Sequence, residues 1–214
     1  MSKEFNPKLK KSNTPKLSID LEPIKKDQEK IRTGLESSRK YSSENLKIPT
    51  KFTESIKMFD HKFTNFLSDN SKDDTTKYMS DYIVKNWNKL KNDVSYFLNN
   101  LDFIQIDIKN GRRIKSICKC YDWELNQHSE NEAEDYLNLA KVDGVKLDKL
   151  NSLRIYIGVD IESKIFTFVF MDPHHLAIPS RHQGLDSITY QNQTFNRCKY
   201  NTKHIYEVID PNTI

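Results

Sequence analysis

Apolar residues recur at steps of three and four between residues 75 and 101, which is the spacing of one helix face. Asp74 or Thr75 stands where a helix N-cap is expected. The pattern therefore predicts an amphipathic helix over this segment. Its apolar positions are Met79, Ile83, Trp87, Leu90, Val94, Phe97 and Leu101.

A second stripe with helical spacing precedes it, and Thr50 is placed to cap it. The polar segment SDNSKDD separates the two stripes, so together they predict an antiparallel helical hairpin. We expect both stripes to pack in a core rather than to line a ligand groove. The apolar positions of the first stripe are Phe52, Ile56, Phe59, Phe63, Phe66 and Leu67.

The pattern then changes to alternation, which is typical of strands. Residues 103–109 alternate around three isoleucines, and Asn110-Gly111 is a preferred pair for a two-residue hairpin turn. Residues 112–121 would return as the partner strand. Further on, Ser129 and Glu132 match a capping box, which predicts a short helix ending near Gly144.

A second strand pair is predicted at residues 153–160 and 165–172, joined by a tight turn. The second of these strands is apolar on both faces, as expected of a central strand. The predicted fold class is α+β, with the helical hairpin packed on an antiparallel sheet. The core should unite Phe59, Phe63, Trp87, Leu90 and Phe168.

Charge divides the chain unevenly. Residues 1–50 hold 12 Lys/Arg against 7 Asp/Glu, a net of +5, which leaves 22 against 23 for the remainder. The first 48 residues also contain three prolines and no sustained apolar period. We therefore predict a disordered basic N-terminal tail over 1–48 and a single α+β domain over 49–214. The tail could contact nucleic acid or an acidic partner, or only raise solubility.

The lengths of the apolar runs and the number of cysteines indicate in which compartment the protein is expected. No apolar run approaches the roughly 20 residues that span a bilayer, and the N-terminus lacks the apolar core of a secretory signal. The three cysteines, Cys118, Cys120 and Cys198, do not form a disulfide framework. These features predict a cytoplasmic protein with no membrane partner.

Two regions carry candidate RNA-binding chemistry. Arg112, Arg113 and Lys115, with Lys119 beyond them, would make a basic strand edge suited to phosphate, or a charged edge that prevents strand aggregation. Residues 184–214 interleave aromatic and basic side chains, a combination that suits single-stranded RNA and also describes an ordinary packed rim.

The exit of the strand 165–172 gathers chemically versatile groups. Asp172 is followed by Pro173, His174 and His175, and imidazoles change charge near neutral pH. The two histidines could act in catalysis, or one could be packed and the other solvated. A metal site formed by Asp172, His174 and His182 is a third possibility, although our prediction includes no metal ligand and no cofactor.

The segment GVKLDKLNSLRIYIGVDIESKIFTFVFMD resembles the C-terminal half of the RelE/ParE/HigB toxin superfamily, with strand, acidic turn and apolar final strand. The resemblance extends over about residues 51–180. This chain has Asp172-Pro173-His174-His175 where the family ends its last strand with Gly-His-Arg, and it has the additional pair Asn110-Gly111.

The resemblance implies a metal-independent endoribonuclease of a toxin–antitoxin system that acts on RNA, often at the ribosome, with an antitoxin as protein partner. It implies catalytic roles for Arg154, Tyr156, His174 and His175, and phosphate binding by Arg181 together with Arg154. The alternative is a non-catalytic module that binds RNA or a protein. A mobile-element origin would suit either.

Overall fold

We describe a computed structural model of the 214-residue chain. It describes residues 45–69, 74–92, 101–105, 108–125, 135–143, 153–160, 163, 165–181 and 184–209, and structural statements below concern these residues. The predicted tail lies outside them except for its last four residues. Of these, Leu46 and Lys47 form a short strand, so the sheet reaches two residues into the segment predicted as tail.

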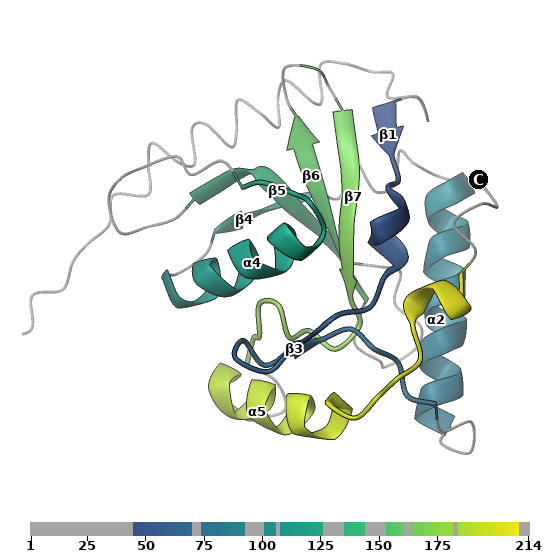
Figure 1. Cartoon of the computed structure of the whole chain (residues 1–214), viewed down its shortest axis with the longest axis vertical. Coiled ribbons are helices and arrows are strands. Elements are labelled where there is room, and N and C mark those ends of the chain that lie inside the picture. Colours follow the sequence, from purple (N-terminus) through teal and green to yellow (C-terminus); the bar gives the residue numbers. More distant parts are fainter. Residues whose placement is uncertain are drawn as a thin grey trace, which may run out of the picture.

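The described residues form an α+β fold with a mixed five-stranded sheet in the order β1-β7-β6-β5-β4 (Figure 1). Strands β4 to β7 pair antiparallel, whereas β1 adds to β7 in parallel. The sheet strands are β1 (Leu46–Lys47), β4 (Asp102–Gln105), β5 (Asp135–Asp143), β6 (Arg154–Asp160) and β7 (Ile165–Asp172).

The other elements are three α-helices, two short 3-10 helices and a small hairpin. The helices are α2 (Asp74–Asn92), α4 (Ile108–Cys120) and α5 (Ser187–Cys198). The 3-10 helices are η2 (Thr50–Thr53) and η3 (Ile205–Glu207), and the hairpin pairs β2 (Lys57–Met58) with β3 (Phe63–Thr64).

The sheet separates two hydrophobic clusters. Trp87 of α2 and Phe52 of η2 pack with Ile157 on one face of β6, whereas Ile114 of α4 packs with Tyr156 on the other. Figure 1 shows α2 and α4 on opposite sides of β6 and β7, which agrees with this division. Both central strands are therefore covered on both faces, as expected for β7 from its apolar sequence.

A β-bulge in β7 explains how that strand contributes to both clusters. One step along β6, from Tyr156 to Ile157, corresponds to two steps along β7, from Phe170 to Phe168. Val169 is the additional residue, and the alternation of sides shifts there by one position. Phe168 consequently packs in the α2 cluster, whereas Phe170 packs in the α4 cluster.

Two of the predicted elements are confirmed closely. Helix α2 begins at Asp74, one of the two predicted cap positions. The strand pair β6–β7 occupies the predicted residues, and Tyr156 lies on the face opposite Ile155 and Ile157. Residues 93–100 of the predicted continuation of α2 lie outside the described residues, whereas Leu101, the last predicted position, is not helical and directly precedes β4.

The first predicted helix of the hairpin is wrong. Residues 50–67 form η2, then the β2–β3 hairpin with Lys62 at φ 50° in its turn. Tertiary contacts override the helical spacing. Asn65 accepts from the Ile56 amide and donates to the Tyr121 hydroxyl and the Met171 carbonyl, which fixes the segment in a non-helical path.

The predicted hairpin turn at Asn110-Gly111 is also wrong, because both residues lie inside α4. Ile114, Ile117 and Cys118 are all buried and stand three and four residues apart. This stripe is helical, and burying it against the sheet outweighs the roughly 1 kcal/mol that a glycine costs within a helix.

The predicted helix ending near Gly144 is wrong as well, since Asp135–Asp143 is strand β5. Leu139 packs in one cluster, whereas Ala140 and Val142 pack in the other. That arrangement follows the two-residue period of a strand between β4 and β6.

The predicted common core is partly correct. Trp87 and Phe168 share the α2 cluster, but Phe63 belongs to the α4 cluster on the other face. Phe59 is 62% exposed in the β2–β3 turn, so its assignment to the core is wrong. The side chain of Leu90 lies outside the described residues.

Candidate functional site

The loop that follows β7 is organised by Asp172, a fully buried carboxylate. Its Oδ1 accepts from the Leu176 amide and its Oδ2 from the Ala177 amide, each at 2.9 Å. Both oxygens therefore stabilise the backbone of the loop. This arrangement also explains why the chain turns sharply after its last strand.

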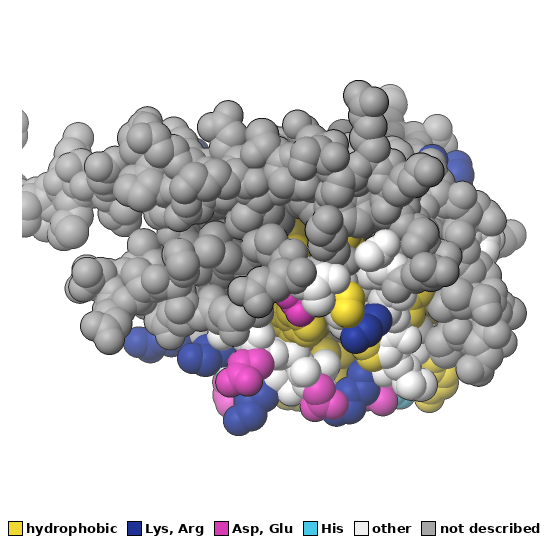
Figure 2. Space-filling model, turned by 90° about the horizontal axis from the view of Figure 1, so that it is seen from above, with side chains coloured by type: hydrophobic (Ala, Val, Ile, Leu, Met, Phe, Trp, Pro, Cys, Tyr) yellow, Lys and Arg dark blue, Asp and Glu magenta, His cyan; other side chains and the backbone are white. Residues whose placement is uncertain are grey.

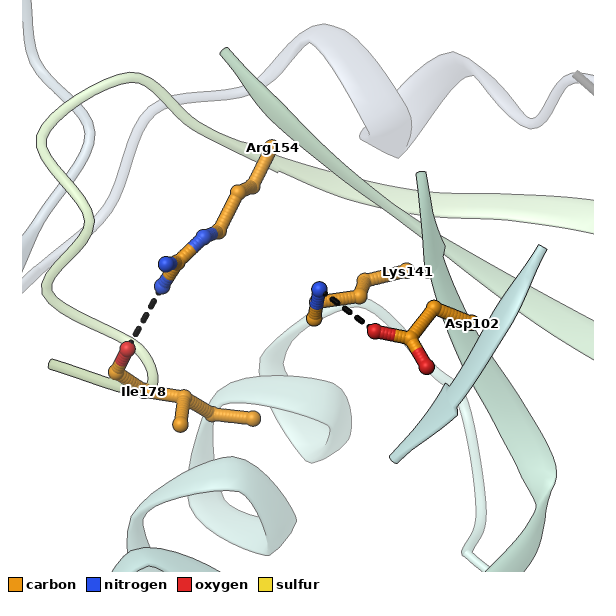
Figure 3. A network of polar contacts seen from close by, with 4 residues as sticks. All are labelled: Asp102, Lys141, Arg154 and Ile178. Atoms are coloured by element: carbon orange, nitrogen blue, oxygen red, sulfur yellow. Dashed lines mark hydrogen bonds and ion pairs between the residues drawn. The ribbon is translucent and has the colours of Figure 1, made fainter. Parts of the chain in front are cut away.

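Arg154 lies beside this loop because it pairs in register with Asp172 across β6 and β7. Its Nη1 donates to the Ile178 carbonyl at 2.6 Å (Figure 3). The neighbouring Lys141 of β5 instead pairs with Asp102 of β4 at 2.7 Å. Arg154 thus ties the sheet to the loop, and phosphate binding by this residue would have to compete with that contact.

Tyr156 is fully buried, so the structure places it in the core. Its ring stacks on Phe170 with centroids 4.3 Å apart, and Phe170 stacks in turn on Tyr121 at 5.5 Å. The predicted catalytic or base-stacking role would require the phenol to leave this stack. Packing is the role that its position supports.

His174 has both ring nitrogens directed at protein atoms. Its Nε2 lies 2.9 Å from the Phe66 carbonyl oxygen, and its Nδ1 lies 3.7 Å from Sγ of Cys198. Burial lowers the pKa of His174, but the neighbouring Cys198 and the Phe66 carbonyl outweigh it, so the pKa is raised above its ordinary value. His174 therefore faces the interior rather than an open substrate site.

His175 is 9% exposed and adopts a left-handed backbone conformation with φ 56°. This conformation is uncommon outside glycine and is held here by the surrounding loop. The small exposed fraction shows that His175 is packed rather than solvated.

Arg113 is the most deeply buried of the predicted RNA-binding cations, with 6% of its surface exposed. Its guanidinium donates to the carbonyls of His61 (3.0 Å) and Ala177 (3.3 Å) and to side-chain oxygens of Asn110 (2.8 Å) and Gln191 (3.1 Å). Four segments meet at this one side chain. Its predicted contact with RNA phosphate would require these bonds to break.

The remaining cations of α4 form an exposed stripe. Arg112, Lys115 and Lys119 are exposed and stand at helical positions i, i+3 and i+7, whereas Ile114 and Ile117 face the sheet. We call Arg112, Lys115 and Lys119 the α4 basic face. The predicted basic residues thus lie on a helix rather than on a strand edge. Lys119 is exposed together with Arg112 and Lys115, whereas Arg113 is buried. Arg181 is exposed in the loop before α5.

Charges of both signs occur elsewhere on the described surface. Figure 2 shows Lys/Arg and Asp/Glu side chains close together along the described part of the face seen from above. Lys51, for example, pairs with Asp122 at 2.6 Å. The α4 basic face differs in holding three like charges on two turns of one helix.

The structure also shows interacting residues that the sequence analysis missed. Gln191 is 4% exposed and links α5 to the β2–β3 turn and to the loop after β7. Cys198 meets His174, which is 24 positions earlier in the chain. No local spacing signals either contact, because both depend on how α5 folds back onto the loop.

The described residues contain no group of three or more His, Cys, Asp or Glu that could hold a metal ion. His182, one member of the possible metal site, lies outside them. No described helix is both long enough and apolar enough to cross a membrane.

Comparisons with protein-family models, with curated proteins and with solved structures found no match to this chain. The resemblance to the RelE/ParE/HigB toxin superfamily therefore remains a prediction.

Proposed function

We propose that this protein is a non-catalytic module that binds RNA through the α4 basic face. The observation that carries the proposal is the exposure of Arg112, Lys115 and Lys119 along one side of a helix. They span about 10 Å at the 1.5 Å helical rise per residue, so several phosphates of one strand can reach them together.

The buried side of α4 supports this role by fixing the helix in place. Ile114 and Ile117 are fully buried, and Arg113 anchors the helix to three other segments. A helix fixed in this way loses no further backbone freedom when RNA binds, so the ordering cost of binding is limited to the side chains themselves.

A second surface suits the bases of single-stranded RNA. Tyr200 is 77% exposed, and the Lys199 ammonium lies 5.1 Å from its ring centroid. Tyr206 is 49% exposed and stacks on His204 with centroids 4.7 Å apart. Exposed aromatic rings beside cations can stack on bases, which adds affinity for unpaired strands.

The test is a titration of the whole chain with a fluorescent single-stranded RNA over a range of salt concentrations. The triple variant R112Q/K115Q/K119Q removes the α4 basic face, and K47Q/K62Q/K85Q removes three exposed cations elsewhere. The first variant should weaken binding at least tenfold and flatten the salt dependence by about 2, at about 0.7 per phosphate lost. The second should leave that dependence nearly unchanged.

Equal losses in the two triple variants would reduce the proposal to general charge attraction, and absence of binding by the natural chain would refute it. Replacing Tyr200 with Leu tests the stacking surface separately, because that change keeps every charge. It should weaken binding of unpaired RNA more than binding of duplex RNA.

A metal-independent endoribonuclease is the second candidate. It is favoured by the register pairing of Arg154 with Asp172 beside His174 and His175. Against it, Asp172, Arg154 and His174 all bond to protein atoms. The same RNA, analysed for fragments in the presence of a chelator, separates the two. Cleavage that depends on His175 would favour the enzyme, and intact RNA would favour the binding module.

A further inference from the structure

The last residue of α5, Cys198, forms a close pair with a histidine from another part of the chain. Its Sγ lies 3.7 Å from Nδ1 of His174, and the thiol is 5% exposed. A thiol beside an imidazole is the arrangement that activates cysteine as a nucleophile when a third group orients the imidazole.

The Phe66 carbonyl supplies that third group. It lies 2.9 Å from Nε2 of His174, and a carbonyl can only accept, so Nε2 carries a proton. Asn201 donates to the same carbonyl at 3.2 Å and helps to hold it. Nδ1 of His174 is thereby directed at the sulfur, where it can accept the thiol proton or donate to the thiolate.

The charged and titratable groups around the pair favour the ionised form. Burial raises the pKa of Cys198, but His174 and then Arg197 outweigh it and lower the pKa below its ordinary value. Asp172 adds to the rise in the pKa of His174, and the Tyr190 hydroxyl lies 3.5 Å from the His174 carbonyl oxygen. Both shifts act in the direction of a thiolate paired with an imidazolium.

The other two cysteines provide internal comparisons. Cys118 is fully buried on α4, and burial raises its pKa far above the ordinary range. Cys120 is exposed near the end of the same helix. One chain thus contains a buried thiol, an exposed thiol and a thiol paired with histidine.

We propose that Cys198 is a modification site at which small peroxides form a sulfenic acid, with His174 as the positioning residue. The thiolate attacks one peroxide oxygen, so an S–O bond forms while the O–O bond breaks. Sulfur loses two electrons to the peroxide. The departing hydroxide takes the proton from Nδ1 of His174 and leaves as water. The low exposure of Cys198 admits a small neutral oxidant better than a bulky reagent.

The experiment treats the folded whole chain with limiting hydrogen peroxide and removes the excess. Dimedone is then added in urea, so that it reaches every sulfenic acid, and each cysteine peptide is quantified by mass spectrometry. At neutral pH, Cys198 should react at least tenfold faster than Cys120, and Cys118 should react most slowly. The variant His174→Gln can keep a donor to Phe66 but loses Nδ1, and it should remove the advantage of Cys198. Reaction of Cys198 no faster than that of Cys120, or at an unchanged rate in His174→Gln, would overturn the proposal.

A second measurement needs no variant. Between pH 8 and pH 6, an ordinary thiol with pKa about 8.5 loses reactivity by roughly two orders of magnitude. The rate at Cys198 should fall by less than the rate at Cys120 over this range in the folded chain, because the pKa of Cys198 is lowered. In urea its profile should become that of Cys120. A Cys198 profile that parallels Cys120 in the folded chain, or an advantage that persists in urea, would contradict the inference.

Discussion

Arg113 on α4 and Gln191 on α5 meet beneath the loop after β7, where Nη2 of the arginine donates to Oε1 of the glutamine at 3.1 Å. Gln191 in turn donates from Nε2 to the His61 carbonyl, which also accepts from Nε of Arg113. The two side chains therefore join both helices to the β2–β3 turn. A polar pair, not only apolar packing, fixes how α5 lies relative to α4.

Replacing Arg113 with Lys should reduce the free energy of unfolding by about 1–3 kcal/mol, because a single ammonium cannot reach all four acceptors and leaves buried carbonyls unsatisfied. Urea denaturation measures the change. Arg112→Lys on the exposed side of the same helix is the matched control and should shift stability by less than about 0.5 kcal/mol. Equal effects at both positions would show that the Arg113 contacts contribute little.

Gly158 on β6 should not tolerate a side chain. A Cβ at this position would overlap the indole ring of Trp123, which lies against the strand. Gly158→Ala should therefore destabilise the fold by about 1–3 kcal/mol through overpacking. Adding Trp123→Leu to Gly158→Ala should recover part of the loss, measured against the Trp123→Leu single variant. No coupling between the two changes would mean that the ring moves aside freely.

Trp87 should be the most costly position to truncate on α2. It is 2% exposed, and the centroid of its ring lies 5.9 Å from that of Phe52, in the hydrophobic cluster between α2 and the sheet. Trp87→Ala should lower the free energy of unfolding by about 3–5 kcal/mol. Lys85→Ala, at an exposed position of the same helix, is the control. Stability close to that of the natural chain would imply that the α2 layer is not a cooperative part of the fold.

Asp186 should make the stability of α5 depend on pH in the acid range. Hydrogen bonds from the Thr189 side chain and amide, and from the Ile188 amide, lower the pKa of this N-cap carboxyl below its usual 3.8. A lowered pKa in the folded state gives stability that is present above pH 3.8 and is lost as pH falls through the folded value.

The comparison for Asp186 uses urea midpoints of the natural chain and Asp186→Asn at a series of pH values. Their difference should be constant at about pH 5–7 and shrink below about pH 4, as the natural carboxyl takes up its proton. Asp60→Asn, at an exposed carboxylate in the β2–β3 turn, is the matched control for removing one negative charge. A difference that grows with acid would contradict the assigned direction.

The sequence correctly predicts those elements in which the spacing of apolar residues matches the faces that are buried in the fold. Helix α2 and the β6–β7 pair have both a regular period and clear boundaries, and they form as expected. Helix α4 could have been recognised from the spacing of Ile114, Ile117 and Cys118, but Asn110-Gly111 favoured a turn. The apolar area that this stripe buries outweighs the cost of the glycine within the helix.

Other features depend on contacts that no short segment contains. Phe59 and Phe63 belong to one apparent helical stripe, yet Asn65 draws the chain into a hairpin that exposes one and buries the other. The candidate site shows the same limit. Arg113 and Lys115 are close in sequence, but the docking of α4 buries the first and exposes the second. Tertiary packing decides which of these side chains is exposed. Only the structure therefore distinguishes Arg113, which anchors α4, from Lys115, which is exposed on the α4 basic face.

The bulge at Val169 reverses which positions of β7 face each side of the sheet. Upstream of it, even-numbered positions such as Phe168 face α2. Downstream, even-numbered positions such as Phe170 and Asp172 face α4. Loss of the single extra residue would rotate the carboxylate of Asp172 to the wrong side of the sheet, away from the amides of Leu176 and Ala177. The whole loop with its two histidines therefore takes its position from one unpaired valine upstream.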